Sequence, residues 1–370
     1  MKIAQLTLTG YYNYGNILQK YALHNVLKNY ADEVDVLWAE EDNFLPETWE
    51  WNWRQKLIDM FNSTEERRKF TFDLIRQSKL KSFTEKYISV RYDIESLENI
   101  SDDYDYFVIG SDQVWNPAWY HSNFPYEERF LLFTAKKKRI AYAASISIPS
   151  IPDDLKVLFR EGILGISKLS VREKGTAMVV QELTGINPTI LIDPTFLLTE
   201  SQWSEISQKP SWFNTKYNGG YILTYFLRGE VPHIVNEMAK DLNLPVINLL
   251  DLNNFNHYTI GIEEFIFLFE HASLIYTNSF HGTVFSILYD RPFVVCNLSK
   301  DVADIDMTSR MDHLLEQFNL RNRKAKEDDN FYLDNLMMRD YAQKQSILNY
   351  EREKAKKFLD EALGSARSEN

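Results

Sequence analysis

The stretch LIYTNSFHGTVFSILYDRPFVVC, residues 274–296, predicts a strand–helix–strand unit with a histidine, His281, at the start of the helix. Residues 274–277 predict a buried strand, and a polar turn, a helix opening at Phe280 or His281 and a second strand at 292–296 follow. The first N–H groups of a helix have no intrahelical partner, and the helix dipole favours an anion there. A histidine in this first turn can therefore sit beside a bound anion and transfer a proton to it.

The same alternation of strands and helices extends outward from this stretch. It predicts two doubly wound parallel sheets, that is, an α/β fold of two Rossmann-like domains. The glycines after the first strand, Gly10 and Gly15, do not form the dinucleotide fingerprint. The expected strands are 2–8, 34–38, 104–109, 139–145, 166–171, 189–192, 221–227 and 246–250, and the expected helices are 17–29, 173–183, 232–242, 262–272 and 308–318.

We expect three parts along the chain. Residues 1–205 form an N-terminal domain on the acceptor side, with a helical insertion at about 40–87 that contains three close tryptophans. Residues 215–330 form a C-terminal domain on the donor side. Residues 331–370 form a helical tail rich in Lys and Glu.

Composition excludes several classes of protein. A formal charge of −12 over 370 residues argues against duplex nucleic acid as the main partner. The single cysteine, Cys296, excludes a disulfide framework and a cysteine-based zinc site, which suits the reducing cytoplasm. The start of the sequence does not resemble a signal peptide, and no apolar run is long enough to span a bilayer. Without HExxH or a paired carboxylate–histidine spacing, we expect no metal, and we read Asp301, Asp304 and Asp306 as a solvated loop.

Polar residues follow the predicted strand ends, where open α/β sheets bind ligands. Arg172 and Arg310 each suit a carboxylate or phosphate, and each could instead form a structural salt bridge. His281 is either a proton-transfer group or a core histidine behind a helix cap. Asn278, Ser279 and Gly282 complete the expected donor site, since they can cap the helix and admit a ligand closely.

Two loops are expected at the mouth of the cleft, on the acceptor side. Asp112 could take up protons or bond a sugar hydroxyl, or it could cap a turn. Trp115 could stack on a sugar or pack in the core. The remaining acceptor candidates are Tyr11, Asn13, Gly15, Asn16 and Asn116.

Taken in order, seven motifs resemble the polysaccharide pyruvyl transferase family over roughly residues 3–320. The resemblance implies a GT-B-like pair of domains with the active site in the cleft between them. It implies transfer of a pyruvyl group from phosphoenolpyruvate to two hydroxyls of a sugar, with His281 catalytic and Arg172 and Arg310 binding the donor. The motifs are GYYNYGNILQKYAL, FVIGSDQVWNP, RIAYAAS, SVREKG, LIDPTFLL, TNSFHGTVFSILYDRPFVV and TSRMDHLL.

We therefore expect a cytoplasmic transferase of exopolysaccharide or capsule biosynthesis that needs no cofactor beyond phosphoenolpyruvate as its donor substrate. Its partner would be a sugar or lipid-linked oligosaccharide. Peripheral attachment of the protein to the inner face of the membrane and a homodimer are both compatible with the sequence. Two alternatives remain at this stage. One is a GT-B glycosyltransferase that uses a nucleotide-sugar donor, and the other is a non-catalytic relative that binds a glycan.

Overall fold

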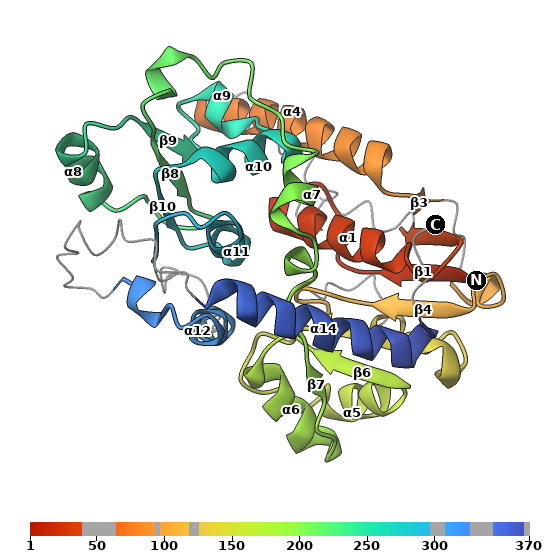
Figure 1. Ribbon diagram of the computed structural model, residues 1–370. Coiled ribbons are helices and arrows are strands. Elements are labelled where there is room, and N and C mark those ends of the chain that lie inside the picture. Colours follow the sequence, from red (N-terminus) through yellow and green to blue (C-terminus); the bar gives the residue numbers. More distant parts are fainter. Residues whose placement is uncertain (39–63, 93–96, 118–125, 297–307, 326–342, 366–370) are drawn as a thin grey trace.

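A computed structural model describes the chain except residues 39–63, 93–96, 118–125, 297–307, 326–342 and 366–370 (Figure 1). It contains a seven-stranded sheet in the order β3-β2-β1-β4-β5-β6-β7 and a four-stranded sheet in the order β11-β10-β8-β9. The first comprises β1 (Lys2–Leu6), β2 (Glu33–Leu37), β3 (Val90–Arg91), β4 (Tyr106–Ile109), β5 (Arg139–Ala144), β6 (Lys168–Val171) and β7 (Thr189–Ile190). The second comprises β8 (Ile222–Tyr225), β9 (Val246–Leu249), β10 (Leu274–Thr277) and β11 (Phe293–Val295).

All the strand pairings are parallel, and this explains the apolar composition of the central strands. Helices cover both faces of a parallel sheet, so that its central strands have no face toward water. Every residue of β8 and β10 is buried accordingly. The prediction of an α/β fold with two Rossmann-like sheets is confirmed.

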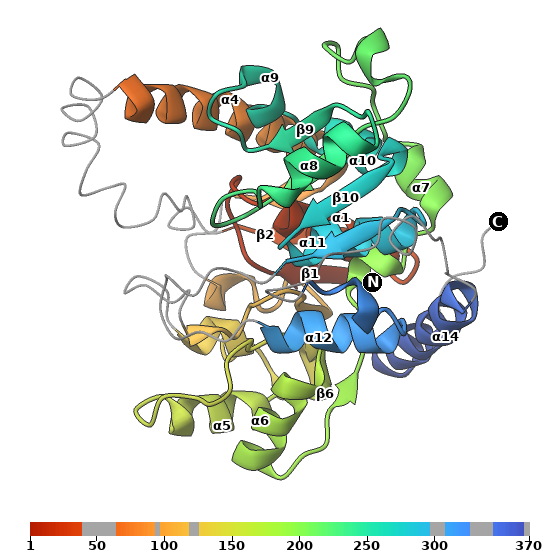
Figure 2. The ribbon, with the colours of Figure 1, turned by 90° about the vertical axis from the view of Figure 1, so that its left-hand side faces the viewer.

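The helices lie around the two sheets, and two of them cross from one half of the molecule to the other (Figures 1 and 2). The helix α4 packs against α9 and α10 beside the second sheet, although it precedes most of the first sheet in sequence. The last helix, α14, returns to the first sheet and buries Phe358 and Leu359 there. The helices are α1 (Tyr14–Leu27), α4 (Thr64–Tyr87), α5 (Lys156–Leu164), α6 (Lys174–Thr184), α7 (Glu200–Ser204), α8 (Ile234–Asp241), α9 (Phe255–Tyr258), α10 (Ile262–His271), α11 (Phe280–Leu288), α12 (Thr308–Gln317) and α14 (Lys344–Leu363).

The observed elements begin and end within a few residues of those expected. Helix α1 starts at Tyr14 rather than Ile17, because the Asn13 side chain accepts a hydrogen bond from the Gly15 N–H and caps the helix earlier. The sequence patterns did not reveal α5, α7, α9 or β3. The three tryptophans expected to pack the insertion lie outside the described residues. No helix in the described part of the chain is long and apolar enough to cross a membrane.

Candidate active site between the two sheets

Asp193 is the centre of a buried cluster where the two halves of the molecule meet. It follows β7, and its carboxylate accepts hydrogen bonds from the Thr195 backbone N–H (3.0 Å) and hydroxyl (2.6 Å). From the second sheet, His281 Nε2 lies 3.7 Å from Asp193 Oδ2. Burial alone would raise the pKa of Asp193, but His281, Arg172 and Thr195 outweigh it and hold that pKa well below its usual range.

Arg172, which directly follows β6, lies among three carboxylates. Its guanidinium donates to Asp193 (2.9 Å) and Asp112 (3.2 Å), and its Nε lies 3.5 Å from the Glu173 carboxylate. Burial lowers the pKa of Arg172, but the three carboxylates raise it more, so the group stays charged. Asp112 follows β4 at a φ of 65°, a backbone region that aspartate tolerates better than most residues.

Arg310 brings a second guanidinium to the same place from α12. Its Nη1 lies 3.7 Å from Asp112 Oδ1, so one carboxylate faces both arginines. Phe280, at the start of α11, lies under both guanidiniums, at 4.5 Å from Arg172 and 5.7 Å from Arg310. Burial, and next the charge of Arg172, lower the pKa of Arg310 to about 10, which still leaves it cationic at neutral pH.

His281 is held in position by the first helix of the other half of the molecule. A Cβ atom added to Gly15 would lie only 2.0 Å from His281 Nδ1, so the glycine at the start of α1 lets the imidazole lie directly against the backbone. The side chain is 7% exposed. At 3.7 Å the approach of Nε2 to Asp193 is too long for a hydrogen bond, so this nitrogen remains available to another partner.

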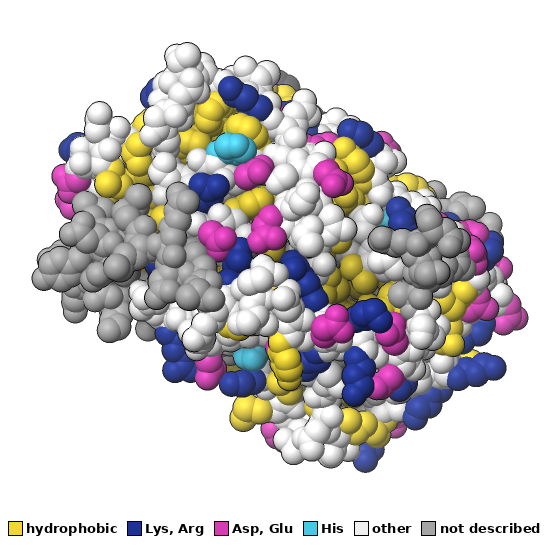
Figure 3. Space-filling view, viewed as in Figure 1, with side chains coloured by type: hydrophobic (Ala, Val, Ile, Leu, Met, Phe, Trp, Pro, Cys, Tyr) yellow, Lys and Arg dark blue, Asp and Glu magenta, His cyan; other side chains and the backbone are white. Residues whose placement is uncertain are grey.

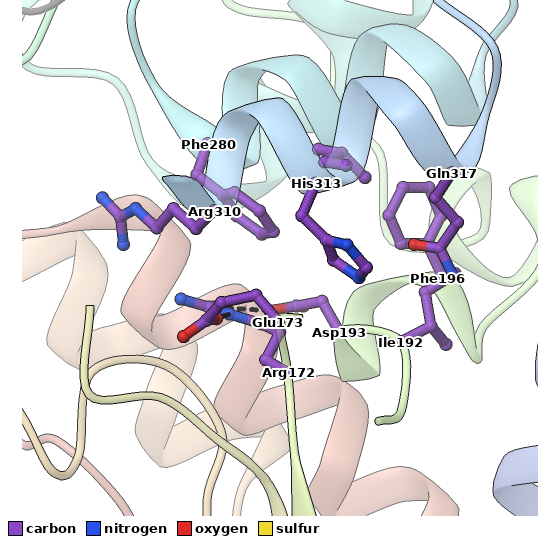
Figure 4. A pocket seen from close by; sticks show the side chains of 10 residues that line it. Arg172, Glu173, Ile192, Asp193, Phe196, Phe280, Arg310, His313 and Gln317 are labelled. Carbon is purple, nitrogen blue, oxygen red and sulfur yellow. Dashed lines mark hydrogen bonds and ion pairs between the residues drawn. The ribbon is translucent and has the colours of Figure 1, made fainter. Parts of the chain in front are cut away.

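A small pocket lies beside this cluster (Figure 4). Its walls come from both halves of the molecule and carry Arg172, Glu173, Ile192, Asp193, Phe196, Phe280, Arg310, His313, Leu314 and Gln317. On the face drawn in Figure 3, acidic and basic side chains are interspersed rather than gathered by sign. The paired arginines are thus a local feature of the pocket. In the described residues, no group of three or more His, Cys, Asp or Glu could hold a metal ion.

The predicted donor residues of the turn before α11 have structural partners. Asn278 Oδ1 accepts from the Leu227 N–H (2.8 Å), and its Nδ2 donates to the Arg228 carbonyl (2.7 Å). Ser279 caps α11 by accepting from the Gly282 N–H (3.3 Å). A Cβ at Gly282 would lie 2.5 Å from Thr277 Oγ1, so this glycine serves strand–helix packing. The turn therefore positions His281, and its side chains do not line the pocket.

The predicted acceptor residues divide between the core and the surface. Trp115 and Asn116 are fully buried, and the Trp115 indole donates to the Arg129 carbonyl (2.8 Å), which contradicts their expected place at the mouth. Tyr11 stacks on Trp38 at 4.8 Å and is partly exposed, and Asn13 is exposed. Asn16 is buried, and its Oδ1 has no hydrogen-bond partner within the described structure.

The sequence reasoning assigned no site role to four residues of the cluster. Asp193 was visible only as the first residue of a turn after a strand, although that position is where sheet ligands bind. Glu173 and Phe280 stood next to residues that had been selected. His313, which stands three residues after Arg310, also lines the pocket. The acidic loop around Asp304 lies outside the described residues.

Comparison with known proteins supplies a family. The sequence profile of polysaccharide pyruvyl transferases matches residues 13–300. No curated protein matches the chain. Among solved structures, Anabaena HepE in complex with UDP and glucose is 9% identical, with 98% of this chain and 99% of that chain covered and a TM-score of 0.45. The UDP-GlcNAc 2-epimerase of Methanocaldococcus jannaschii is 13% identical, with 95% and 100% covered and a TM-score of 0.45.

Proposed function

The chain belongs to the polysaccharide pyruvyl transferase family, and we propose that it forms a cyclic pyruvate ketal on a sugar. In this reaction phosphoenolpyruvate supplies the pyruvyl group, two sugar hydroxyls attack its C2 in turn, and phosphate leaves. The observation that carries the proposal is that Arg172 and Arg310 line one pocket together with Asp193, while the imidazole of His281 lies 3.7 Å from the Asp193 carboxylate. We further propose that the acceptor is a precursor of an exopolysaccharide or capsule, modified in the cytoplasm or at the inner face of the membrane.

The charges of the cluster suit a donor that carries both a carboxylate and a phosphate. Arg172 and Arg310 come from opposite walls, so each can bind one anionic group of the donor with a planar fork of N–H donors. Asp112 faces both guanidiniums in the unliganded protein. We therefore assign Asp112 to holding the two arginines in place until the donor enters, rather than to the acceptor sugar as the sequence suggested.

Proton balance gives His281 its role. The methylene carbon of phosphoenolpyruvate gains one proton and becomes a methyl group, which leaves a cationic C2 that the first hydroxyl captures. Imidazolium at His281 would donate that proton, and the neutral ring would then accept a hydroxyl proton. Asp193, 3.7 Å away and kept ionised by its surroundings, stabilises the imidazolium before the transfer.

The acceptor sugar is assigned to the side of the pocket where α1 begins. Gly15 already contacts the ring of His281, and Asn13 and Tyr11 precede it on an accessible loop. A sugar bound along this loop would bring its hydroxyls to the imidazole. Tyr11, whose hydroxyl is paired with that of Tyr92 (2.9 Å), offers an aromatic edge, and Asn13, whose Oδ1 accepts from the Gly15 N–H, offers its amide group.

The test is a mass-shift and phosphate-release assay with phosphoenolpyruvate and a panel of acceptor glycosides. Wild-type protein should add a pyruvate ketal to at least one glycoside and release one phosphate per ketal. His281→Ala should fold normally and form no ketal, whereas His233→Ala, at a histidine whose side chain is 82% exposed, should retain full activity. Ketal formation near the wild-type rate by His281→Ala would disprove the assignment. Transfer from UDP- or GDP-sugars without any from phosphoenolpyruvate would replace the proposal with a glycosyltransferase.

A further inference from the structure

His313 lines the pocket and is supplied by α12. It stands three residues after Arg310, a spacing that places both side chains on the same face of the helix. It lines the pocket together with Arg172 and Phe280, and its ring points from α12 toward Glu173 and Asp193 on the opposite wall (Figure 4). Two histidines therefore lie near Asp193: His281 at the start of α11, 3.7 Å from its carboxylate, and His313 of α12, which shares the pocket wall with it.

The ring of His313 has no hydrogen-bond partner of its own. Both ring nitrogens are buried, and no residue in the described structure bonds to either of them. An unsatisfied buried polar group costs free energy, and a site that binds a polar ligand is one place where such a group persists. The nitrogens of His313 are therefore positioned to bond to something that enters the pocket.

The surroundings of His313 favour its neutral form. Burial lowers its pKa, and the carboxylate of Glu173 opposes this only in part. A phosphate entering the pocket would add negative charge and favour the protonated ring. The charged groups around it are Glu173 and Lys174 at the start of α6, Arg310 and Glu316 on its own helix, Lys354 on α14, and Arg172 and Asp193 across the pocket.

We propose that His313 binds the phosphate of the donor and protonates it as it leaves. This inference rests on the proposed pyruvyl transfer. The reaction releases two hydroxyl protons, of which one ends on the methyl carbon and the other on phosphate. When the bond between C2 and the bridging oxygen breaks, its electron pair stays on that oxygen, and imidazolium at His313 supplies the proton. The second hydroxyl then captures C2, and its proton passes to the now neutral His313, so that both imidazoles regain their starting charge.

Separate histidines for the two protons remove a conflict at His281. After donating to the methylene carbon, His281 is neutral and suited to accept a hydroxyl proton. It cannot at the same moment donate to phosphate. A second imidazole, which His313 brings into the pocket from α12, allows both transfers without reloading one ring.

Isothermal titration of phosphoenolpyruvate into the whole protein, in buffers of different ionisation enthalpy, tests the binding part without any acceptor. Wild-type protein and the exposed control His233→Gln should take up about one proton per donor bound at pH 7.5–8. His313→Gln should lose this uptake and bind phosphoenolpyruvate and inorganic phosphate about tenfold more weakly or worse. Its affinity for pyruvate, which lacks the phosphate, should be unchanged, and this also shows that the variant is folded.

The protonation part is tested with the glycoside that the panel identifies. His313→Gln should lower kcat about 100-fold or more, and by more than it changes the KM of the acceptor. If His313→Gln matched wild-type protein in proton uptake, phosphate affinity and kcat, the inference would be overturned and the proposed function would stand. Wild-type protein that neither binds nor uses phosphoenolpyruvate would instead refute the proposed function itself.

Discussion

Replacing Gly15 with alanine should lower the activity strongly, although Gly15 itself takes no part in the chemistry. The added Cβ would lie 2.0 Å from His281 Nδ1 and 2.5 Å from its Cγ, whereas ordinary contacts begin at 3.4 Å. The Cβ would be fixed to the backbone of α1, so the imidazole of His281 is the group that must move, by about 1.4 Å. A misplacement of about 1 Å costs on the order of 100-fold in rate, so kcat should fall by at least about 100-fold. Overpacking should also lower the free energy of unfolding by about 1–3 kcal/mol.

The assay is phosphate release with phosphoenolpyruvate and the glycoside that wild-type protein uses, together with urea unfolding. Gly219→Ala is the matched control, because a Cβ there meets nothing within 4 Å and no unusual φ is required. The control should match wild-type protein in both measurements. If Gly15→Ala retained kcat within threefold of the wild type, His281 would not need its present position, and the geometric argument for its role would fail.

Two further predictions concern the carboxylate and arginine of the cluster. Asp193→Asn should lower the free energy of unfolding by about 3–5 kcal/mol at pH 7, because Arg172 loses a buried charged partner. Since the pKa of Asp193 is depressed in the folded protein, its contribution is present above the unfolded pKa of about 3.9 and is lost as pH falls below it. Urea titrations should therefore give a difference in the free energy of unfolding between the two proteins that narrows below about pH 4. A difference independent of pH would contradict the assigned charge of Asp193. Arg172→Lys keeps the charge but loses the planar fork, so titration should show about 10- to 100-fold weaker binding of phosphoenolpyruvate, and unchanged affinity would remove Arg172 from the donor site.

Parts of the candidate site could be predicted because they follow strand ends. Asp112, Arg172 and His281 each come within four residues of the end of a buried strand, and parallel sheets gather those ends at one edge. The structure brings these residues together with Arg310.

Other expectations failed because local sequence does not say which face of an element is covered. Trp115 was a candidate for sugar stacking, but its indole is enclosed and donates to the carbonyl of Arg129. Asn278 has the chemistry of a ligand-binding residue, but the loop after β8 uses both ends of its amide. In each case a segment distant in sequence supplied the partner, and no pattern within the motif could reveal it.

The parallel α/β architecture could be predicted from local sequence. Apolar strands that alternate with amphipathic helices have few other arrangements that form their backbone hydrogen bonds and bury their apolar faces. Local sequence also determined that a histidine stands in the first turn of α11, since a helix start is a local property. Packing between distant segments places Asp193 near this histidine, makes Gly15 the residue that leaves room for it, and turns His313 into the pocket beside Asp193. These are contacts between segments far apart in the chain, and they depend on how the two sheets pack against each other.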